Sequence, residues 1–428
     1  MLVSQPATRE KTPRGRIGLA IAGGGPVGGM YELGALRALD EAIEGLDLTR
    51  LTVYVGVSSG AFIAAALANR MSTADITRIF ITHSANDVQF RPEVFLRPAF
   101  REYGRRAAAL PRVLLEWWRD LLLDPARAGD LPARFGALIP TGVFDNEEIG
   151  RFLARAYSLH GRTNDFRELH RKLYIVAVDL DSGEAVRMGD AQWNDVPISR
   201  AIQASSALPG LYPPVSIRGR QFVDGALRRT MHASVALEED IDLLIGINPL
   251  VPFDASRARA AGRAPQSLVR NGLPTVLSQT LRTILQSRMQ VGIAKYANQY
   301  DDVDKLFLEP DGDDAEMFFT SAFSYRSRRQ VCEHAYRATL KDLRLRRDTL
   351  APLLARHGLS LRDAVLDDPD RSMLDGLAPE RRRQGNTLAR LRRALDDVDS
   401  LIARRNPLPA PRPPTGPRRR RKSHADPL

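Results

Sequence analysis

The chain has 428 residues, 43% of them hydrophobic and 26% charged, which is enough for a sizeable globular core. It contains neither an apolar run of the ~18 residues that a membrane span requires nor a signal-peptide pattern. Its single cysteine excludes an intrachain disulfide framework and a cysteine-based zinc site. Residues 404–428 carry +7 of the net charge of +11, so the body of the chain is near neutral, and we expect a cytoplasmic protein without a nucleic-acid partner.

The first part of the chain alternates predicted strands and helices after a polar leader. Residues 1–14 include two prolines and predict a disordered leader. Two apolar segments, each followed by a helical pattern, come next: strands Ile17–Ala22 and Leu51–Gly56, and helices Gly28–Glu44 and Ser59–Asn69. This order predicts an α/β fold in which helical crossovers join parallel strands.

The strand pattern stops between residues 90 and 140, where we predict a helical insertion. Its apolar residues share one helical face: Leu110, Val113, Leu114, Trp117, Trp118, Leu121 and Leu122. Two interpretations remain open. The face packs on the sheet, which is the commoner outcome for an amphipathic helix, or it contacts a membrane, because adjacent tryptophans with nearby arginines suit a bilayer interface.

Further elements are predicted along the rest of the chain. The strands are Leu173–Val178, Gln221–Val223, Ile241–Ile247 and Lys305–Leu308, and the helices are Phe144–Tyr157, Pro197–Ser206, Leu273–Ala297, Arg326–Leu354 and Arg383–Arg404. We therefore expect a main domain over residues 15–323, a helical C-terminal extension over 324–404 and a disordered Pro/Arg-rich tail over 405–428. The basic cluster of that tail, Arg418–Lys422, is a second candidate for contact with anionic lipid.

A G-x-S-x-G motif occupies the predicted junction between the second strand and the second helix. Gly56 and Gly60 flank Ser58 there, and in this context the motif is typical of a nucleophile elbow, a turn so sharp that its flanking positions tolerate only minimal side chains. The following helix N-terminus would favour negative charge near the serine. The alternative is a Gly/Ser turn that merely connects two elements.

A glycine loop lies in the corresponding place after the first strand. Backbone N–H groups of Gly23, Gly24, Gly25 and Gly28 could form an oxyanion hole, and losing one such donor typically costs ~3 kcal/mol of transition-state stabilisation. The same spacing spells G-x-G-x-x-G, the dinucleotide fingerprint. That fingerprint expects an acidic residue at the end of the second strand, whereas Asp47 precedes the strand and Ser58 follows it, so the oxyanion interpretation is favoured.

Asp224 is the best candidate for the base that a nucleophilic serine needs. It ends a short predicted strand and begins the triplet Asp224-Gly225-Ala226. A carboxylate is a weak base for a hydroxyl, so burial would have to raise its pKa. Asp-Gly is also a common hairpin-turn dipeptide, and His232 stays open as an alternative base.

The three motifs occur in one order, GGGPVG at residues 23–28, GVSSG at 56–60 and VDGA at 223–226, and from about Arg16 to Pro249 the chain resembles the patatin-like phospholipases. Three further stretches resemble that family: YELGALRAL in the first helix, VAVDLDSGEAV at Val176–Val186 and ASSALPGLYPPV at Ala204–Val215. The resemblance implies a three-layer α/β sandwich with a central, mostly parallel sheet flanked by helices, and neither a metal nor a cofactor.

Carried over residue by residue, the resemblance implies Ser58 as nucleophile, Asp224 as base and Gly24 and Gly25 as oxyanion donors. Many family members carry Arg or Lys where this sequence has Val27. The leading hypothesis is a serine acyl-hydrolase of lipid esters, of the phospholipase A or lysophospholipase type. A non-catalytic lipid-binding protein with the same fold and a nucleotide-binding enzyme are the alternatives.

Overall fold

The computed structural model describes residues 1–377 except 10–11, 83–94, 124–135, 137, 160, 261, 263–266 and 321–324. The chain divides into a compact unit from Met1 to Leu377 and a second unit from Ala378 to Leu428. The second unit lies outside the described residues, and with it the predicted helix Arg383–Arg404 and the predicted tail over 405–428.

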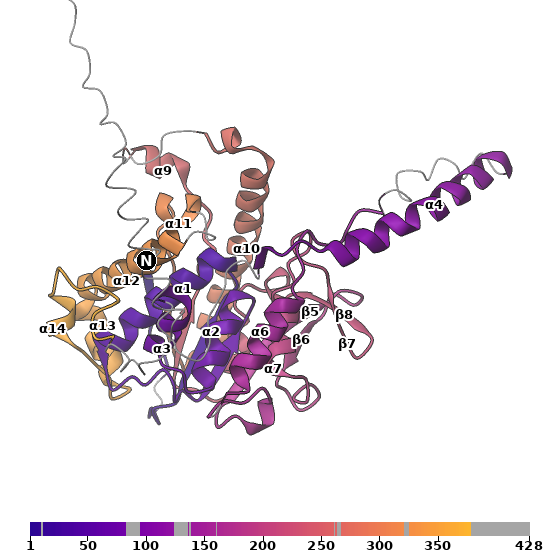
Figure 1. The fold of residues 1–428 in the computed structure, drawn as a ribbon. Coiled ribbons are helices and arrows are strands. Elements are labelled where there is room, and N and C mark those ends of the chain that lie inside the picture. Colours follow the sequence, from indigo (N-terminus) through magenta and orange to yellow (C-terminus); the bar gives the residue numbers. More distant parts are fainter. Residues whose placement is uncertain are drawn as a thin grey trace, which may run out of the picture. The chain divides into compact units, whose positions relative to one another are not determined.

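A nine-stranded mixed sheet forms the centre of the first unit (Figure 1). Its main path runs β1-β10-β9-β2-β4-β5-β8-β7, with β6 paired to β5. Adjacent strands from β10 to β5 are parallel, and the strands beyond them pair antiparallel. The strands are β1 (Leu2–Gln5), β2 (Ile17–Ile21), β4 (Val53–Gly56), β5 (Lys172–Asp179), β6 (Ala185–Met188), β7 (Val215–Ile217), β8 (Arg220–Asp224), β9 (Leu243–Ile247) and β10 (Asp304–Leu308).

Helices cover both faces of the sheet. The α-helices described in this unit are α1 (Gly25–Ala42), α2 (Ser59–Ala68), α3 (Thr73–Thr77), α4 (Phe100–Leu123), α6 (Glu147–Tyr157), α7 (Ile198–Ser205), α8 (Ala233–Leu237), α9 (Ala255–Ala260), α10 (Gly272–Gln299), α11 (Ala315–Phe319), α12 (Tyr325–Leu345), α13 (Arg347–Ala355) and α14 (Asp363–Leu366). A small second sheet pairs β3 (Ile43–Glu44) with β11 (Ser360–Leu361).

Strand alternation separates two apolar cores and creates three layers. Leu19 and Ile21 of β2 join the larger core with side chains of α1, α2 and α12, whereas Ala20 between them joins a smaller core with α8 and α10. The same alternation separates Ile245 of β9 from its neighbour Leu244. Because successive strand side chains point to opposite faces, both faces of the sheet are buried. The fold is therefore the expected α/β sandwich with helices on both sides of the sheet.

The N-terminus differs from the prediction of a disordered leader over residues 1–14. Leu2–Gln5 form β1, which pairs antiparallel with β10, and the Leu2 side chain is fully buried in the larger core. The sequence signal was weak because a four-residue edge strand is too short to show clear periodicity. The C-terminal extension is helical in its described part, and α12 packs against α1 through a hydrogen bond from Tyr336 to Glu41 (2.6 Å).

The predicted insertion contains α4, whose apolar stripe is largely uncovered by the rest of the described chain. Trp118 is 57% exposed and Leu122 is 74% exposed, while Trp117 is partly buried and meets Trp118 edge to face. The interpretation in which this face packs on the sheet does not hold for Trp118 and Leu122. None of the described helices combines the length and the apolarity that crossing a bilayer requires.

Candidate active site

The predicted motifs meet at the carboxyl ends of two neighbouring parallel strands. β2 pairs in parallel with β4, so the glycine loop after β2 and Ser58 after β4 lie at the same edge of the sheet. Helices α1 and α2 start directly from these two loops, at Gly25 and Ser59. Two helix N-termini therefore point toward this edge, and their partial positive charges favour an anion there.

Ser58 adopts the strained backbone that a nucleophile elbow requires. Its φ of +50° lies in the left-handed region, which residues with a Cβ rarely adopt. The flanking glycines are needed for space: a Cβ on Gly56 would lie 2.5 Å from the Cα of Ala61, and one on Gly60 would lie 2.5 Å from the carbonyl oxygen of Ile21. The G-x-S-x-G pattern thus reflects backbone crowding around a buried turn.

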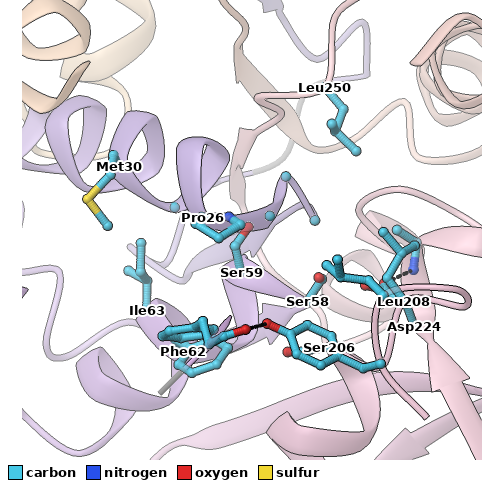
Figure 2. A pocket seen from close by; sticks show the side chains of 18 of the residues that line it. Pro26, Met30, Ser58, Ser59, Phe62, Ile63, Ser206, Leu208, Asp224 and Leu250 are labelled. Carbon is cyan, nitrogen blue, oxygen red and sulfur yellow. Dashed lines mark hydrogen bonds between the residues drawn. The ribbon is translucent and has the colours of Figure 1, made fainter. Parts of the chain in front are cut away.

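The Asp224 side chain reaches Ser58 from the end of β8. Burial raises its pKa to about 6, while the neighbouring Ser58 side chain and a hydrogen bond from the Ala226 N–H (2.9 Å) act in the opposite direction. An aspartate with this pKa is still mostly ionised at neutral pH, and it is a stronger base than an exposed one. Figure 2 shows both side chains at the pocket.

His232, the alternative candidate for a base, does not line the pocket that contains Ser58. It is buried, its Nε2 lies 3.2 Å from the Gly225 carbonyl oxygen, and burial lowers its pKa to about 4. No histidine among the described residues lines the pocket that contains Ser58. His232 instead contacts the backbone beside Asp224.

The glycine loop offers fewer free donors than the sequence predicts. The Gly23 N–H donates to the Thr230 carbonyl (3.1 Å), and the Gly28 N–H donates to the Gly24 carbonyl (3.1 Å), so neither is available to an oxyanion. The N–H groups of Gly24 and Gly25 form no hydrogen bond with the described residues. The prediction of Gly23 and Gly28 as oxyanion donors is therefore wrong, and Gly24 and Gly25 remain as candidate donors.

Two contacts around the elbow were missed by the sequence analysis. Ser205 of α7 accepts the Ser58 N–H (2.9 Å) and donates to the Val176 carbonyl (2.6 Å), which ties the elbow to β5. Glu32 of α1 is fully buried and accepts a hydrogen bond from the Ser59 hydroxyl (2.8 Å). Burial raises the pKa of Glu32 well above its usual value. Both residues lie in stretches that resemble the family, but nothing in the sequence alone assigned them a contact.

Ser58 and Asp224 open into a pocket of about 260 Å³ with a mainly apolar lining (Figure 2). Its lining comes from the glycine loop, α1, α2, the segment after α7 and α10. The apolar side chains include Met30, Leu33, Phe62, Ile63, Ile76, Phe80, Leu208, Leu211, Leu250, Leu281 and Leu285. Such a lining fits a hydrocarbon chain beside the serine.

The dinucleotide interpretation is contradicted by the position of Asp47, the acidic residue that would have to hold the ribose. Asp47 is exposed, accepts hydrogen bonds from Thr49, and precedes β4, so it lies toward the opposite end of the strand from the glycine loop. Within the described ranges, no group of three or more His, Cys, Asp or Glu side chains is arranged to hold a metal ion.

A family model described as patatin-like phospholipase matches residues 19–237, just over half of the chain. Similar solved structures include VipD from Legionella pneumophila (18% identity, 61% of this chain and 55% of that chain, TM-score 0.29). A second is the type III effector ExoU, known from Pseudomonas aeruginosa (17% identity, 80% of this chain and 64% of that chain, TM-score 0.27). A third is human GIVD cytosolic phospholipase A2 (15% identity, 69% of this chain and 49% of that chain, TM-score 0.27). The chain thus spans less than two thirds of the length of each, and the family assignment depends on the family model.

Proposed function

The chain belongs to the patatin-like phospholipase family, a family of lipid hydrolases, and from this premise we propose that it is a serine acyl-hydrolase that cleaves carboxylic esters of lipids. The reaction would be of the phospholipase A or lysophospholipase type. The observation that carries the proposal is the pairing of Ser58 with a buried carboxyl of raised pKa, Asp224, at the wall of an apolar pocket.

In the proposed first step, the Ser58 Oγ attacks the acyl carbonyl carbon while Asp224 accepts the hydroxyl proton. The Gly24 and Gly25 N–H groups donate to the carbonyl oxygen as it becomes negatively charged, and the α1 and α2 N-termini add favourable dipoles. Asp224 then returns the proton to the leaving alkoxide. This step leaves an acyl group on Ser58 and releases an alcohol or lysolipid.

In the second step, Asp224 takes a proton from water, and the resulting hydroxide attacks the acyl-enzyme carbonyl. The same N–H donors stabilise the second oxyanion, and its collapse returns the proton to Ser58 and releases a fatty acid. The apolar pocket supports this assignment, because it offers the acyl chain a place to remain between the two steps. No group beyond the chain and water enters this sequence.

We also propose that α4 contacts aggregated lipid, with the basic tail as the second candidate. The exposed Trp118 and Leu122 of α4 support the first assignment, because an amphipathic helix with exposed Trp and Leu gains free energy at a bilayer interface. The tail lies outside the described residues, so only its Arg418–Lys422 composition supports a role.

The decisive test is covalent labelling with a fluorophosphonate probe, together with ester hydrolysis against a lipid panel. Wild type should be labelled and should release fatty acid, whereas Ser58→Ala should lose both while its thermal unfolding is retained. The matched control is Ser158→Ala, which removes an exposed hydroxyl at the end of α6 and should keep both activities. A wild-type chain that binds lipid but is neither labelled nor active would instead support the non-catalytic lipid-binding alternative.

A further inference from the structure

The guanidinium group of Arg282 lies in the wall of the mainly apolar pocket, whose lining also includes Arg328. Arg282 belongs to α10, and its neighbours Ser278, Leu281 and Leu285 on the same helix also line the pocket. The family model ends at residue 237, so this wall lies outside the matched segment. Arg282 is partly buried, and removing a charge from water without a counter-charge is costly.

The structure holds this guanidinium in place without neutralising it. Its Nη1 donates to the Val251 carbonyl (3.1 Å), and the group lies over the Phe318 ring at 5.2 Å from the ring centre. None of the described carboxylates pairs with Arg282, and burial alone lowers the pKa of the guanidinium. A guanidinium has five N–H donors, so donors remain for a ligand in the pocket.

The backbone that holds Arg282 also lies against the glycine loop. Val251 follows Pro249 by two residues, and the Pro249 Cγ would lie only 2.4 Å from a Cβ added to Gly24. Leu250, between them, lines the pocket together with Gly24 and Ser58. Arg282 is therefore anchored to the segment that packs on the candidate oxyanion donors, on the α10 side of the same pocket.

We propose that Arg282 binds the phosphate of a phospholipid whose ester lies at Ser58, and so selects phosphate-bearing lipids over uncharged glycerolipids. This inference rests on the proposed acyl-hydrolase function and narrows its substrate class. A planar guanidinium can offer two parallel N–H donors to phosphate oxygens, and such charge-assisted bonds are stronger where water is excluded. In a phospholipid, the glycerol backbone separates the phosphate from the reacting ester. A pocket that holds the ester at Ser58 and the phosphate at Arg282 therefore matches this substrate.

The test compares two substrates with the same acyl ester, 1-oleoyl-lysophosphatidylglycerol and 1-monooleoylglycerol, presented in the same neutral detergent micelles. Arg282→Gln should lower kcat/KM for the phospholipid by about 10- to 100-fold, mainly through KM, and change that for monooleoylglycerol by less than about 3-fold. Arg282→Lys should recover part of the loss, because it restores the charge without the bidentate geometry. The control Lys295→Gln removes an exposed charge from the same helix and should change neither value.

Other outcomes overturn the inference. An equal loss on both substrates would make Arg282 a structural support of the pocket, and an unchanged phospholipid preference would give it no role in recognition. If Arg282→Gln instead weakens product inhibition by oleate and leaves the phospholipid preference unchanged, the anion that Arg282 binds is a fatty-acid carboxylate and not a phosphate.

Binding separates failure of this inference from failure of the proposed function. In the Ser58→Ala background, calorimetry with the same two lipids should show that Arg282→Gln weakens only phospholipid binding, whether or not wild type hydrolyses either ester. Equal affinities for both lipids in that background would overturn the phosphate subsite even if wild type is an active esterase.

Discussion

At the scale of single residues, burial makes Asp224 a stronger base than an exposed aspartate. Removal from water destabilises the charged form and raises its pKa to about 6, against the opposing effects of the Ser58 side chain and the Ala226 N–H. Burial also raises the pKa of Glu32, and there only the hydrogen bond from the Ser59 hydroxyl acts to lower it. Two buried carboxyl groups near one elbow are therefore expected to titrate differently.

The pH dependence of hydrolysis should follow Asp224. The base must be deprotonated to accept the Ser58 proton, so kcat/KM should fall as pH drops below about 6, approaching a tenfold loss for each further pH unit. The measurement is kcat/KM for a soluble ester between pH 4.5 and pH 8 (about the range in which histidine and perturbed carboxylates titrate), with thermal unfolding followed at each pH. An acid limb centred near 4, or one that persists in Asp224→Asn, would contradict the assignment.

Glu32 should contribute a pH-dependent cost to folding. Its folded-state pKa is raised above the unfolded value, so between these two values the folded state binds more protons, and stability falls as pH rises. Glu32→Gln keeps an acceptor for Ser59 and cannot ionise. We expect this variant to gain stability relative to wild type on going from pH 4 to pH 8 (about the span over which the unfolded carboxyl loses its proton), as measured by urea denaturation. A difference that is constant with pH would mean that Glu32 does not titrate in this range.

The sequence predicted Ser58, Asp224, Gly24 and Gly25, because local motifs encode strand-to-helix turns. It did not predict Ser205, Glu32 or Arg282. Ser205 contacts Ser58 across 147 positions of sequence, and the Ser59–Glu32 contact spans 27 positions. Such contacts depend on strand order and helix packing, which one sequence does not specify. The internal hydrogen bonds of Gly23 and Gly28 were likewise invisible, since they depend on where Thr230 lies and where α1 begins.

At the scale of elements, α4 is the clearest departure from the usual burial of an amphipathic helix. Such a helix normally covers its apolar stripe with the body of the protein. Here Trp118 and Leu122 of that stripe are 57% and 74% exposed. A lipid surface would remove that apolar area from water, which gives the helix a function that packing does not supply.

Replacing Trp117 and Trp118 together with alanine should separate surface binding from chemistry. We expect hydrolysis of vesicle lipid to fall several-fold, since burying each indole contributes on the order of 1–2 kcal/mol. Hydrolysis of short soluble esters should be unchanged. Trp193, the third tryptophan, packs against Phe222, so a vesicle-induced shift in tryptophan emission should come from α4 and disappear in the variant.

Leu345→Ala is the control for this experiment, because it removes an exposed apolar side chain from α12. It should leave vesicle hydrolysis unchanged. If the double tryptophan variant loses both activities together with its melting temperature, the tryptophans stabilise the fold and the interfacial role of α4 is wrong.

The longer elements were predictable because their patterns are long. Helices α1, α2 and α10 and strands β2, β4, β5 and β9 all overlap the predicted segments. The short antiparallel strands β1, β6 and β7 were not predicted, since three or four residues do not establish an alternation. These strands extend the sheet beyond its parallel centre. They form because a neighbouring strand is available for pairing, and not because their own sequences show a strand pattern.

At the scale of the described unit, segments distant in sequence complete one core. β1 closes one edge of the sheet by pairing with β10, about 300 residues later, as the register between Leu2 and Leu308 shows. α12 packs on α1, where the Cys332 thiol donates to the Met30 carbonyl (3.1 Å). The family model ends at residue 237, so β9, β10 and α12 lie outside the matched segment, yet their apolar residues belong to the same core.

This arrangement predicts that the first residues of the chain contribute to global stability. Leu2 is 1% exposed within the larger core, so Leu2→Ala should lower the free energy of unfolding by about 2–5 kcal/mol, through lost apolar burial and the cavity that remains. The same substitution at Leu345, which is 69% exposed, should change it by less than about 0.5 kcal/mol. Urea denaturation of both variants measures the difference. If neither variant changes the free energy of unfolding, β1 does not pair stably with β10, and the prediction of a disordered leader would be correct.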